Sequence, residues 1–418
     1  MKSDLDALMK ARNLDAILIF GDAENNPPMY YFVGGGHVSG ALLIKPLGQE
    51  PVLFYNDMER DEAAKSGLKT RSFNEYPGQD FLEQANGDMQ TVSALRFKKM
   101  LADYGVTKGR VAVFGKLEFS NLFGTMMKLV VHAPEIEFIG ESGFDSVLLQ
   151  AMETKEDVEV ARIRQMGAVT TEIVGMVQEL LTSSDVRSDE VLLKADGSPL
   201  TIGDVKVKIA LWLAERGAVD VEGVIFSIGR DAGVPHSVGG PDDLITLGKT
   251  IVFDIFPAEK GGGYFYDFTR TWSLGYASPE AIAMYDEVKE IYDKVVENLD
   301  MNANFVDYQR MTCEFFESKG HKTQLSSKNP LEGYVHSLGH GVGLNIHERP
   351  GSSLLRDQGD NKLKPGVVIT IEPGLYYPEK GMGFRIEDTY WVTPDGEFDL
   401  LAEFPYDFVL PMKKWKKS

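Results

Sequence analysis

Five polar residues interrupt apolar or glycine-rich segments between positions 251 and 389 of the chain. They are Asp254 in IVFDIFP, Asp267 in YFYDFTRTW, His340 in HSLGHGVG, Glu372 in VVITIEPG and Glu387 in FRIEDTYWV. Four of these segments have the Val, Ile, Phe and Tyr content that is typical of strands. An ionised carboxylate in a buried strand is costly unless it is paired or bound to a metal. Four carboxylates and a histidine in this arrangement therefore predict a metal site.

Strand alternation and spacing indicate how two of these acids come together. Successive side chains of a strand point to opposite faces, so Asp267 and Thr269 share one face and Arg270 lies on the other. Asp254 precedes Asp267 by 13 positions, and the two can share a site if the glycine-rich segment 259–263 forms a turn. A shared site for both acids thus depends on a hairpin turn in this segment.

The kinds of ligand in this set restrict the metal. Four carboxylates and one imidazole favour a hard or borderline divalent ion such as Mn²⁺, Co²⁺ or Zn²⁺. The negative charge exceeds what one ion needs, so we predict two ions that share bridging carboxylates. Two ions can hold a bridging hydroxide as nucleophile and polarise a carbonyl oxygen. The alternative is that the acids are separate strand-end or salt-bridged groups, because structural ion pairs also bury carboxylates.

The composition is that of a globular protein, and its charge disfavours one class of partner. With 418 residues, of which 43% are hydrophobic and 25% charged, the chain is expected to form two domains. The net charge of -20 disfavours nucleic acid, because phosphate binding requires clustered Lys and Arg. The single cysteine, Cys313, allows no disulfide within the chain and is interpreted as a buried structural thiol.

Two features argue against a membrane-bound or secreted protein. No apolar run approaches the roughly 18 residues of a membrane span. The first 20 residues carry Asp4, Asp6 and Asp15 and lack a basic segment followed by an apolar core, so we expect no signal peptide. We therefore expect a cytoplasmic protein without a membrane partner.

Residues 1–150 are expected to form an N-terminal α/β domain. Strand-like apolar runs occur at 16–22, 41–44, 52–55, 111–115 and 136–140, and helical patterns occur at 5–15, 57–66 and 91–104. Strands that alternate with helices are typical of this class.

Residues 151–418 are expected to form a second domain, which contains the five polar residues. A long helix is predicted to begin after Thr154, which we expect to cap it. A second helix is predicted at about 203–216, and a third begins at Ser278, a cap followed by proline. A fourth helix ends before Gly320.

The segments around the five polar residues resemble those of the pita-bread metallopeptidases, most closely prolidase and aminopeptidase P. The matching segments, in family order, are FDIFP, YDFTRTW, HSLGHGVGLNIHE, KPGVVITIEPGLY and FRIEDTYWVT. The resemblance implies a two-domain α+β fold. Its N-terminal part is a creatinase-like α/β domain, and its C-terminal part is a pita-bread domain with a curved antiparallel sheet and flanking helices.

The resemblance also implies a dinuclear metal centre. Its expected ligands are Asp254, Asp267, His340, Glu372 and Glu387. Asp267 and Glu387 would bridge or chelate the ions, and Glu372 would also carry a proton from water to the leaving amine. Two divalent ions are expected, with Mn²⁺ as the first choice and Co²⁺ or Zn²⁺ as alternatives.

Four further residues receive roles from the resemblance. His236, in VPHSVG, corresponds to a family histidine that lines the substrate pocket. His347, in NIHERP, corresponds to a histidine that contacts the substrate carbonyl, where a hydrogen-bond donor would stabilise the developing negative charge. Arg385 corresponds to an arginine that either binds the substrate carboxylate or orients Glu387. His336 is expected to support the site.

The implied activity is hydrolysis of the peptide bond between an N-terminal residue and proline, through a metal-bridging hydroxide. Dipeptidase and aminopeptidase activities both remain open, with a small peptide as substrate and a homodimer as the expected assembly. A non-peptidase relative, such as a creatinase-like hydrolase, and a non-catalytic binding module are the alternatives; the five intact ligands argue against both. Departures from the family pattern around His236 and at 351–362 leave the substrate specificity open.

Overall fold

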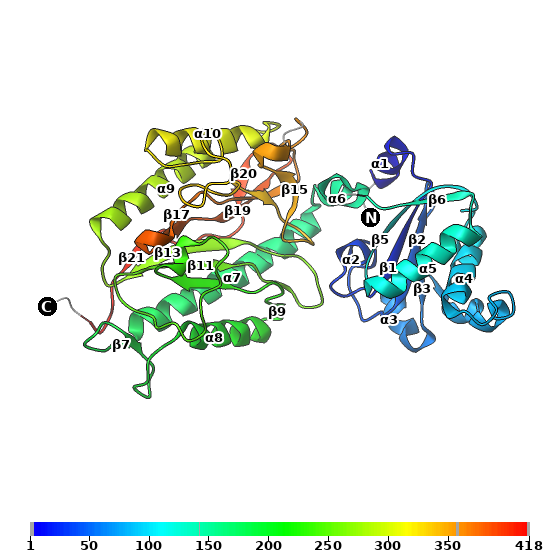
Figure 1. Ribbon diagram of the computed structural model, residues 1–418, viewed down its shortest axis with the longest axis horizontal. Coiled ribbons are helices and arrows are strands. Elements are labelled where there is room, and N and C mark those ends of the chain that lie inside the picture. Colours follow the sequence, from blue (N-terminus) through cyan, green and yellow to red (C-terminus); the bar gives the residue numbers. More distant parts are fainter. Residues whose placement is uncertain (1–3, 142, 357–358, 416–418) are drawn as a thin grey trace. The chain divides into compact units, whose positions relative to one another are not determined.

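The computed structural model describes residues 4–141, 143–356 and 359–415. It divides into two compact units, which are described separately (Figure 1). The first comprises Met1–Met152 and Gly261–Gly263, and the second comprises Glu153–Lys260 and Tyr264–Ser418. Positions 357 and 358 of the divergent segment at 351–362 lie outside the described residues.

The first unit is built on one mixed six-stranded sheet. The strand order is β4 (Lys69–Ser72), β3 (Val52–Tyr55), β2 (Ala41–Pro46), β1 (Ala16–Gly21), β5 (Gly109–Lys116) and β6 (Ile136–Ile139). The helices are α1 (Leu5–Ala11), α2 (Pro27–Val33), α3 (Arg60–Lys65), α4 (Met89–Asp103), α5 (Phe119–His132) and α6 (Val147–Met152). Strand β1 is buried along its whole length, as expected for a central strand covered on both faces. Its Leu18 and Phe20 share a core with Met100 of α4 and Leu129 of α5.

The second unit has four long helices. They are α7 (Asp157–Ser183), α8 (Ile202–Glu215), α9 (Pro279–Glu297) and α10 (Phe305–Ser318). Ser278 caps α9 by accepting a hydrogen bond from the Ala281 N–H, as predicted. The prediction that Thr154 caps α7 is wrong. The cap is Glu156, which exchanges capping hydrogen bonds with Glu159, whereas Thr154 forms a backbone bridge with Val367.

The strands of the second unit form two larger sheets between these helices. One has the order β10 (Ile225–Ile228), β11 (Thr250–Ile255), β13 (Phe268–Leu274) and β21 (Val409–Leu410). The other has the order β15 (Glu348–Gly351), β14 (His340–Gly341), β16 (Val368–Ile371), β19 (Asp388–Val392) and β20 (Phe398–Leu400). Figure 1 shows α9 and α10 on one side of the strands and α7 and α8 on the other. A bridge between Thr269 and Glu387 connects the two sheets.

Three short strand pairs complete this unit. They are β17 (Gly374–Tyr377) with β18 (Met382–Arg385), β12 (Ala258–Glu259) with β9 (Ala218–Val219), and β7 (Asp185–Val186) with β8 (Leu192–Leu193). The core joins α9 and α10 to β16, β17, β18 and β19 and includes Val288, Phe316, Ile369 and Phe384. Cys313 is fully buried within it, as predicted.

The hairpin on which a shared site depends is present and brings Asp254 close to Asp267. Strands β11 and β13 are antiparallel, with Asp254 opposite Thr269. The connection contains Gly261 and Gly262, both with φ of +90°, a conformation that favours glycine. Within the described ranges, no helix combines the length and the apolar character needed to cross a membrane.

Candidate metal centre

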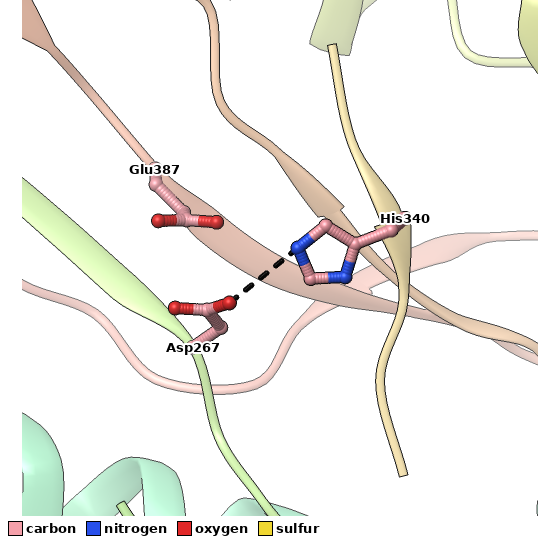
Figure 2. Close-up of side chains that lie close together, drawn as sticks. All are labelled: Asp267, His340 and Glu387. Carbon is pink, nitrogen blue, oxygen red and sulfur yellow. Dashed lines mark ion pairs between the residues drawn. The ribbon is translucent and has the colours of Figure 1, made fainter. Parts of the chain in front are cut away.

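Asp267, His340 and Glu387 direct their side chains toward a common point (Figure 2). One ligand atom of each residue lies within 4.8 Å of the ligand atoms of the other two. The Nε2 atom of His340 is 3.5 Å from Asp267 Oδ2. The three residues come from three different segments, and a cation could contact all of them at once.

Asp267 and Glu387 lie where the two sheets are connected by the bridge between Thr269 and Glu387. Asp267 immediately precedes β13, and Glu387 immediately precedes β19. Thr269 Oγ1 donates a hydrogen bond of 2.7 Å to Glu387 Oε2. Thr389 Oγ1 donates a hydrogen bond of 2.8 Å to the carbonyl oxygen of Asp267. Each ligand segment is therefore fixed by a threonine of the other.

His340 is oriented by its own strand. Its Nδ1 lies 3.0 Å from the carbonyl oxygen of Gly341, which can only accept a hydrogen bond. Nδ1 therefore carries the proton, and the lone pair of Nε2 points toward the acids. Gly341 also allows β15 to approach, because a Cβ there would lie 2.0 Å from the Arg349 carbonyl oxygen.

Glu372 extends the cluster on the side of His340. It follows β16, and its Oε1 lies 3.5 Å from His340 Nε2. Its backbone N–H donates to the Leu338 carbonyl oxygen at 2.7 Å, which fixes the residue beside the His340 segment.

Asp254 reaches the site from near the C-terminal end of β11 and is paired with Arg385. Arg385 Nη2 donates to Asp254 Oδ2 at 2.5 Å. Its Nε donates to Thr269 Oγ1 at 3.2 Å, and its Nη1 donates to Tyr376 Oη at 2.8 Å. The guanidinium is buried, and all three of its nitrogen atoms donate hydrogen bonds to these protein groups.

Three buried carboxylate oxygens of this cluster lack a donor. Among the residues that the structure describes, Asp254 Oδ1, Asp267 Oδ1 and Glu387 Oε1 are buried without a hydrogen-bond partner. Buried polar atoms are nearly always satisfied, so three orphaned oxygens from three ligand candidates call for a cation. Carboxylates with one imidazole are also the donor set that Mn²⁺ and Zn²⁺ accept. The site fits divalent metal ions.

The pKa values of the clustered carboxyl groups are raised, as expected where buried acids outnumber the nearby cations. Burial, followed by repulsion from neighbouring carboxylates, raises the pKa of Asp267 and Glu387 well above the ordinary range. Burial raises the pKa of Glu372 to about 8. Burial also lowers the pKa of His340 to about 3, so its imidazole is neutral and able to bind a metal.

His236 and His347 lie on the solvent-exposed side of the centre. The His347 ring is 4.3 Å from the His340 ring between centroids. Burial is the main factor that lowers the pKa of His347, while the charge of Glu222 acts to raise it. His236 is exposed and interacts electrostatically with Asp254 and His347. All the residues that the sequence predicted for the site thus lie in the second unit and around one cluster.

Tyr376 is a contributor that the sequence analysis missed. Its hydroxyl lies 2.8 Å from His336 Nε2 and 2.8 Å from Arg385 Nη1, and so connects the two residues. His336 itself is 3.8 Å from Glu372 Oε2, where it supports the ligand from behind. A buried tyrosine normally has a partner for its hydroxyl, but its sequence position alone does not say which.

The comparisons with known proteins identify the class and then the family. Solved dipeptidase structures align with nearly the whole chain, so the predicted two-domain α+β fold with its pita-bread domain is confirmed. Residues 161–394 match metallopeptidase family M24, which covers more than half of the chain. The chain belongs to this family.

Some of its relatives match nearly the whole sequence. An Xaa-Pro dipeptidase from Pyrococcus furiosus is 28% identical over 95% of this chain and 97% of its own length. The structure of an Xaa-Pro dipeptidase from Bacillus anthracis aligns with 97% of this chain and 98% of its own, with a TM-score of 0.73 and 21% identity. An X-Pro aminopeptidase from Thermotoga maritima covers 94% of this chain and 97% of its own, with a TM-score of 0.71 and 22% identity.

Proposed function

We propose that this protein hydrolyses the peptide bond between an N-terminal residue and proline, using divalent metal ions. The observation that carries the proposal is the convergence of Asp267, His340 and Glu387, each with a ligand atom within 4.8 Å of the others. Relatives along nearly the whole chain are Xaa-Pro dipeptidases, and these support the substrate class.

Two metal ions, with Mn²⁺ as the first choice and Co²⁺ or Zn²⁺ as alternatives, complete this proposal. The ligands would be Asp254, Asp267, His340, Glu372 and Glu387. Bound ions of this kind supply Lewis-acid activation of a water molecule and of the substrate carbonyl oxygen. The three orphaned carboxylate oxygens, together with Glu372 at 3.5 Å from His340, support a centre with more than one cation.

The residues around the ligands would handle the substrate and the proton. Glu372 borders the cluster at 3.5 Å from His340, a place from which it could carry a proton to the proline nitrogen. His347 and His236, on the exposed side, would contact the substrate carbonyl and line the pocket. Arg385 already pairs with Asp254 and bonds to Thr269, which supports an orienting role rather than capture of the substrate carboxylate.

The length of the substrate distinguishes the two forms of this activity. A dipeptidase has to recognise the C-terminal carboxylate, whereas an aminopeptidase has to leave that end open. Hydrolysis of Ala-Pro and of Ala-Pro-Ala by the Mn²⁺-loaded protein, with Ala-Ala as control, decides between them. Cleavage of neither proline peptide, with or without metal, would refute the proposal.

Assembly and domain roles follow from the resemblance and remain predictions. We propose a homodimer in the cytoplasm, with residues 1–150 as the creatinase/prolidase-like domain and residues 151–418 as the catalytic domain. A creatinase-like activity or a non-catalytic role would be expected of a chain with missing ligands, and all five are present here. Sedimentation of the purified protein tests the dimer.

A further inference from the structure

Arg270 and Asp388 form a buried ion pair directly behind the metal ligands. Asp388 follows Glu387 in sequence, and Arg270 lies three positions after Asp267. Arg270 Nη2 donates to Asp388 Oδ1 at 2.8 Å, and both side chains are excluded from solvent. Neither residue belongs to the proposed ligand set, yet each is on the segment of a ligand.

The Arg270 guanidinium reinforces the backbone bridge between Thr269 and Glu387, which joins the two ligand segments. In that bridge, the Thr269 N–H lies 3.4 Å from the Glu387 carbonyl oxygen, and the Glu387 N–H lies 3.1 Å from the Thr269 carbonyl oxygen. The first contact is long for a backbone hydrogen bond. Arg270 Nη1 donates to both carbonyl oxygens, at 3.0 Å to Thr269 and 2.9 Å to Glu387. One nitrogen thus holds the two segments together where their own bonding is weak.

The remaining donors of Arg270 fix its position. Nε donates to the Pro405 carbonyl oxygen at 3.0 Å, and Nη2 donates to the Phe404 carbonyl oxygen at 2.9 Å. With the bonds to Thr269, Glu387 and Asp388, five contacts match the five N–H groups of a guanidinium. Aromatic rings of Phe268 and Tyr406 lie 4.2 Å and 4.3 Å from its central carbon. Lysine has only three donors and no planar fork, so it could not make this set of contacts.

Both carboxylate oxygens of Asp388 also accept hydrogen bonds. Its Oδ2 accepts hydrogen bonds from Tyr292 Oη at 2.6 Å and from Tyr406 Oη at 2.8 Å. The Tyr292 hydroxyl is in turn 2.7 Å from that of Tyr390. The carboxylate is therefore compensated by one cation and two hydroxyl donors. Movement of a buried charge would break these hydrogen bonds, so a fully bonded ion pair holds its segments in fixed positions.

We propose that Arg270, oriented by Asp388, is a positioning residue that sets the separation of the Asp267 and Glu387 carboxylates and thereby the affinity for metal. Glu387 is one residue of the bridge that Arg270 clamps, and Asp267 lies two positions before the other, Thr269, so a change in the bridge changes the spacing of the oxygens that face the ion. The inference rests on the proposed metal-dependent function. It adds a determinant of metal affinity outside the ligand set.

The test is metal binding by the Arg270→Lys variant of the full-length protein, measured by calorimetric titration of the metal-free form with Mn²⁺. Loss of an outer partner of a ligand typically costs 10- to 100-fold in metal affinity, and we expect a decrease of ~10-fold or more. Activity at saturating Mn²⁺ should recover toward the wild-type level, because the ligands themselves are intact. Tyr406→Phe removes one donor to Asp388 but keeps the ring, and should weaken binding by a smaller factor.

The matched control is Lys45→Met, which removes a buried cation from the other unit, where Lys45 pairs with Asp6. It should lower thermal stability but leave Mn²⁺ affinity unchanged. Unchanged affinity in Arg270→Lys, with a stability loss like that of the control, would overturn the inference while wild-type activity upholds the proposed function. If Arg270→Lys does not fold, the Mn²⁺ affinity of Tyr406→Phe decides: a decrease supports the inference, and an unchanged affinity overturns it. A wild-type protein that binds no metal would overturn both proposals.

Discussion

Asp267 and Glu387 show at the scale of single residues why this site favours a cation. Each has one buried carboxylate oxygen without a donor, while its other oxygen faces a neighbouring group of the cluster. Arg385 is the one cation whose guanidinium contacts an acid of the set directly among the described residues, through Asp254. One guanidinium cannot neutralise four carboxylates, so added divalent charge would be strongly favoured.

Asp267→Asn tests this charge argument. The change removes one ligand charge and keeps the shape of the side chain, so we expect kcat to fall by ~10³-fold, which corresponds to about 4 kcal/mol. The metal-free variant should be at least as stable as the metal-free wild type, because the amide is neutral and needs no proton, whereas the buried Asp267 carboxyl has to take one up to relieve its repulsion from the neighbouring acids. Activity assays and thermal unfolding measure the two effects. Glu290→Gln, at a half-exposed position of α9, is the control and should change neither.

The dependence of stability on pH follows from the same groups. Burial raises the pKa of Glu372 from 4.5 to about 8 and lowers those of His336 and His340 from 6.5 to about 3. The unfolded histidines are half protonated at pH 6.5 and neutral by about pH 7.5, so their protons offset only part of the carboxyl effect at the lower end of this range. Between pH 6.5 and 8 the folded chain holds protons that the unfolded chain has lost.

Metal-free protein should therefore lose stability as the pH rises from 6.5 to 8, by up to about 1.4 kcal/mol per pH unit for each such carboxyl group. In the Mn²⁺-loaded protein the carboxylates are ionised in both states, and this slope should disappear. Denaturant unfolding at several pH values measures both slopes. A metal-free protein whose free energy of unfolding is constant or increases across this window would contradict the charge account.

At the scale of elements, α7 places two glycines in different surroundings. A Cβ at Gly167 would lie 2.7 Å from the Tyr266 ring, beside Asp267. A Cβ at Gly175 would meet only Phe404, at an ordinary 3.7 Å. The helix can therefore approach the β13 segment closely at one glycine, and has no such need at the other.

The two glycines give a matched pair of substitutions. Gly175→Ala should raise the free energy of unfolding by about 0.5–1 kcal/mol, because alanine is the better helix former and fits without strain. Gly167→Ala should lower it by about 1–3 kcal/mol, because the added methyl group pushes against Tyr266. Chemical denaturation of both variants checks the difference. Equal effects would mean that α7 does not pack on Tyr266 as described.

The hairpin and the cap show what local sequence could and could not predict. The β11–β13 hairpin was predictable, because a period of two and a glycine-rich turn are local signals. The cap of α7 was not, because Thr154 is drawn into a bridge with Val367, far away in the sequence. Likewise, the Arg270–Asp388 pair joins residues 118 positions apart, and sequence alternation showed only that Arg270 faces away from the ligands. Ligand types could be read from the motifs, whereas the contacts that hold them depend on the tertiary fold.

At the scale of the whole molecule, the predicted site residues are all in the second unit, and the first unit has a core of its own. Chains with two cores commonly unfold in more than one step. A ligand that binds only the folded form stabilises the unit that holds it, by about 2.7 kcal/mol at 100 times its dissociation constant.

Calorimetric unfolding with and without Mn²⁺ should therefore show one transition that metal moves and one that it does not. The metal-sensitive transition belongs to the second unit, because the ligands lie there. The Asp267→Asn variant should lose the metal-induced shift and keep the metal-insensitive transition in place. An equal shift of both transitions in the wild type would contradict a site confined to the second unit.

The central claim is that hydrolysis of an Xaa-Pro bond depends on metal held by these five side chains. The most direct measurement strips the protein with a chelator and follows Ala-Pro and Ala-Pro-Ala hydrolysis as Mn²⁺ is added back. Activity should be absent without metal and should reach its maximum near two equivalents of Mn²⁺ per chain. Full hydrolysis by the stripped protein, or none at any Mn²⁺, Co²⁺ or Zn²⁺ concentration, would contradict the claim.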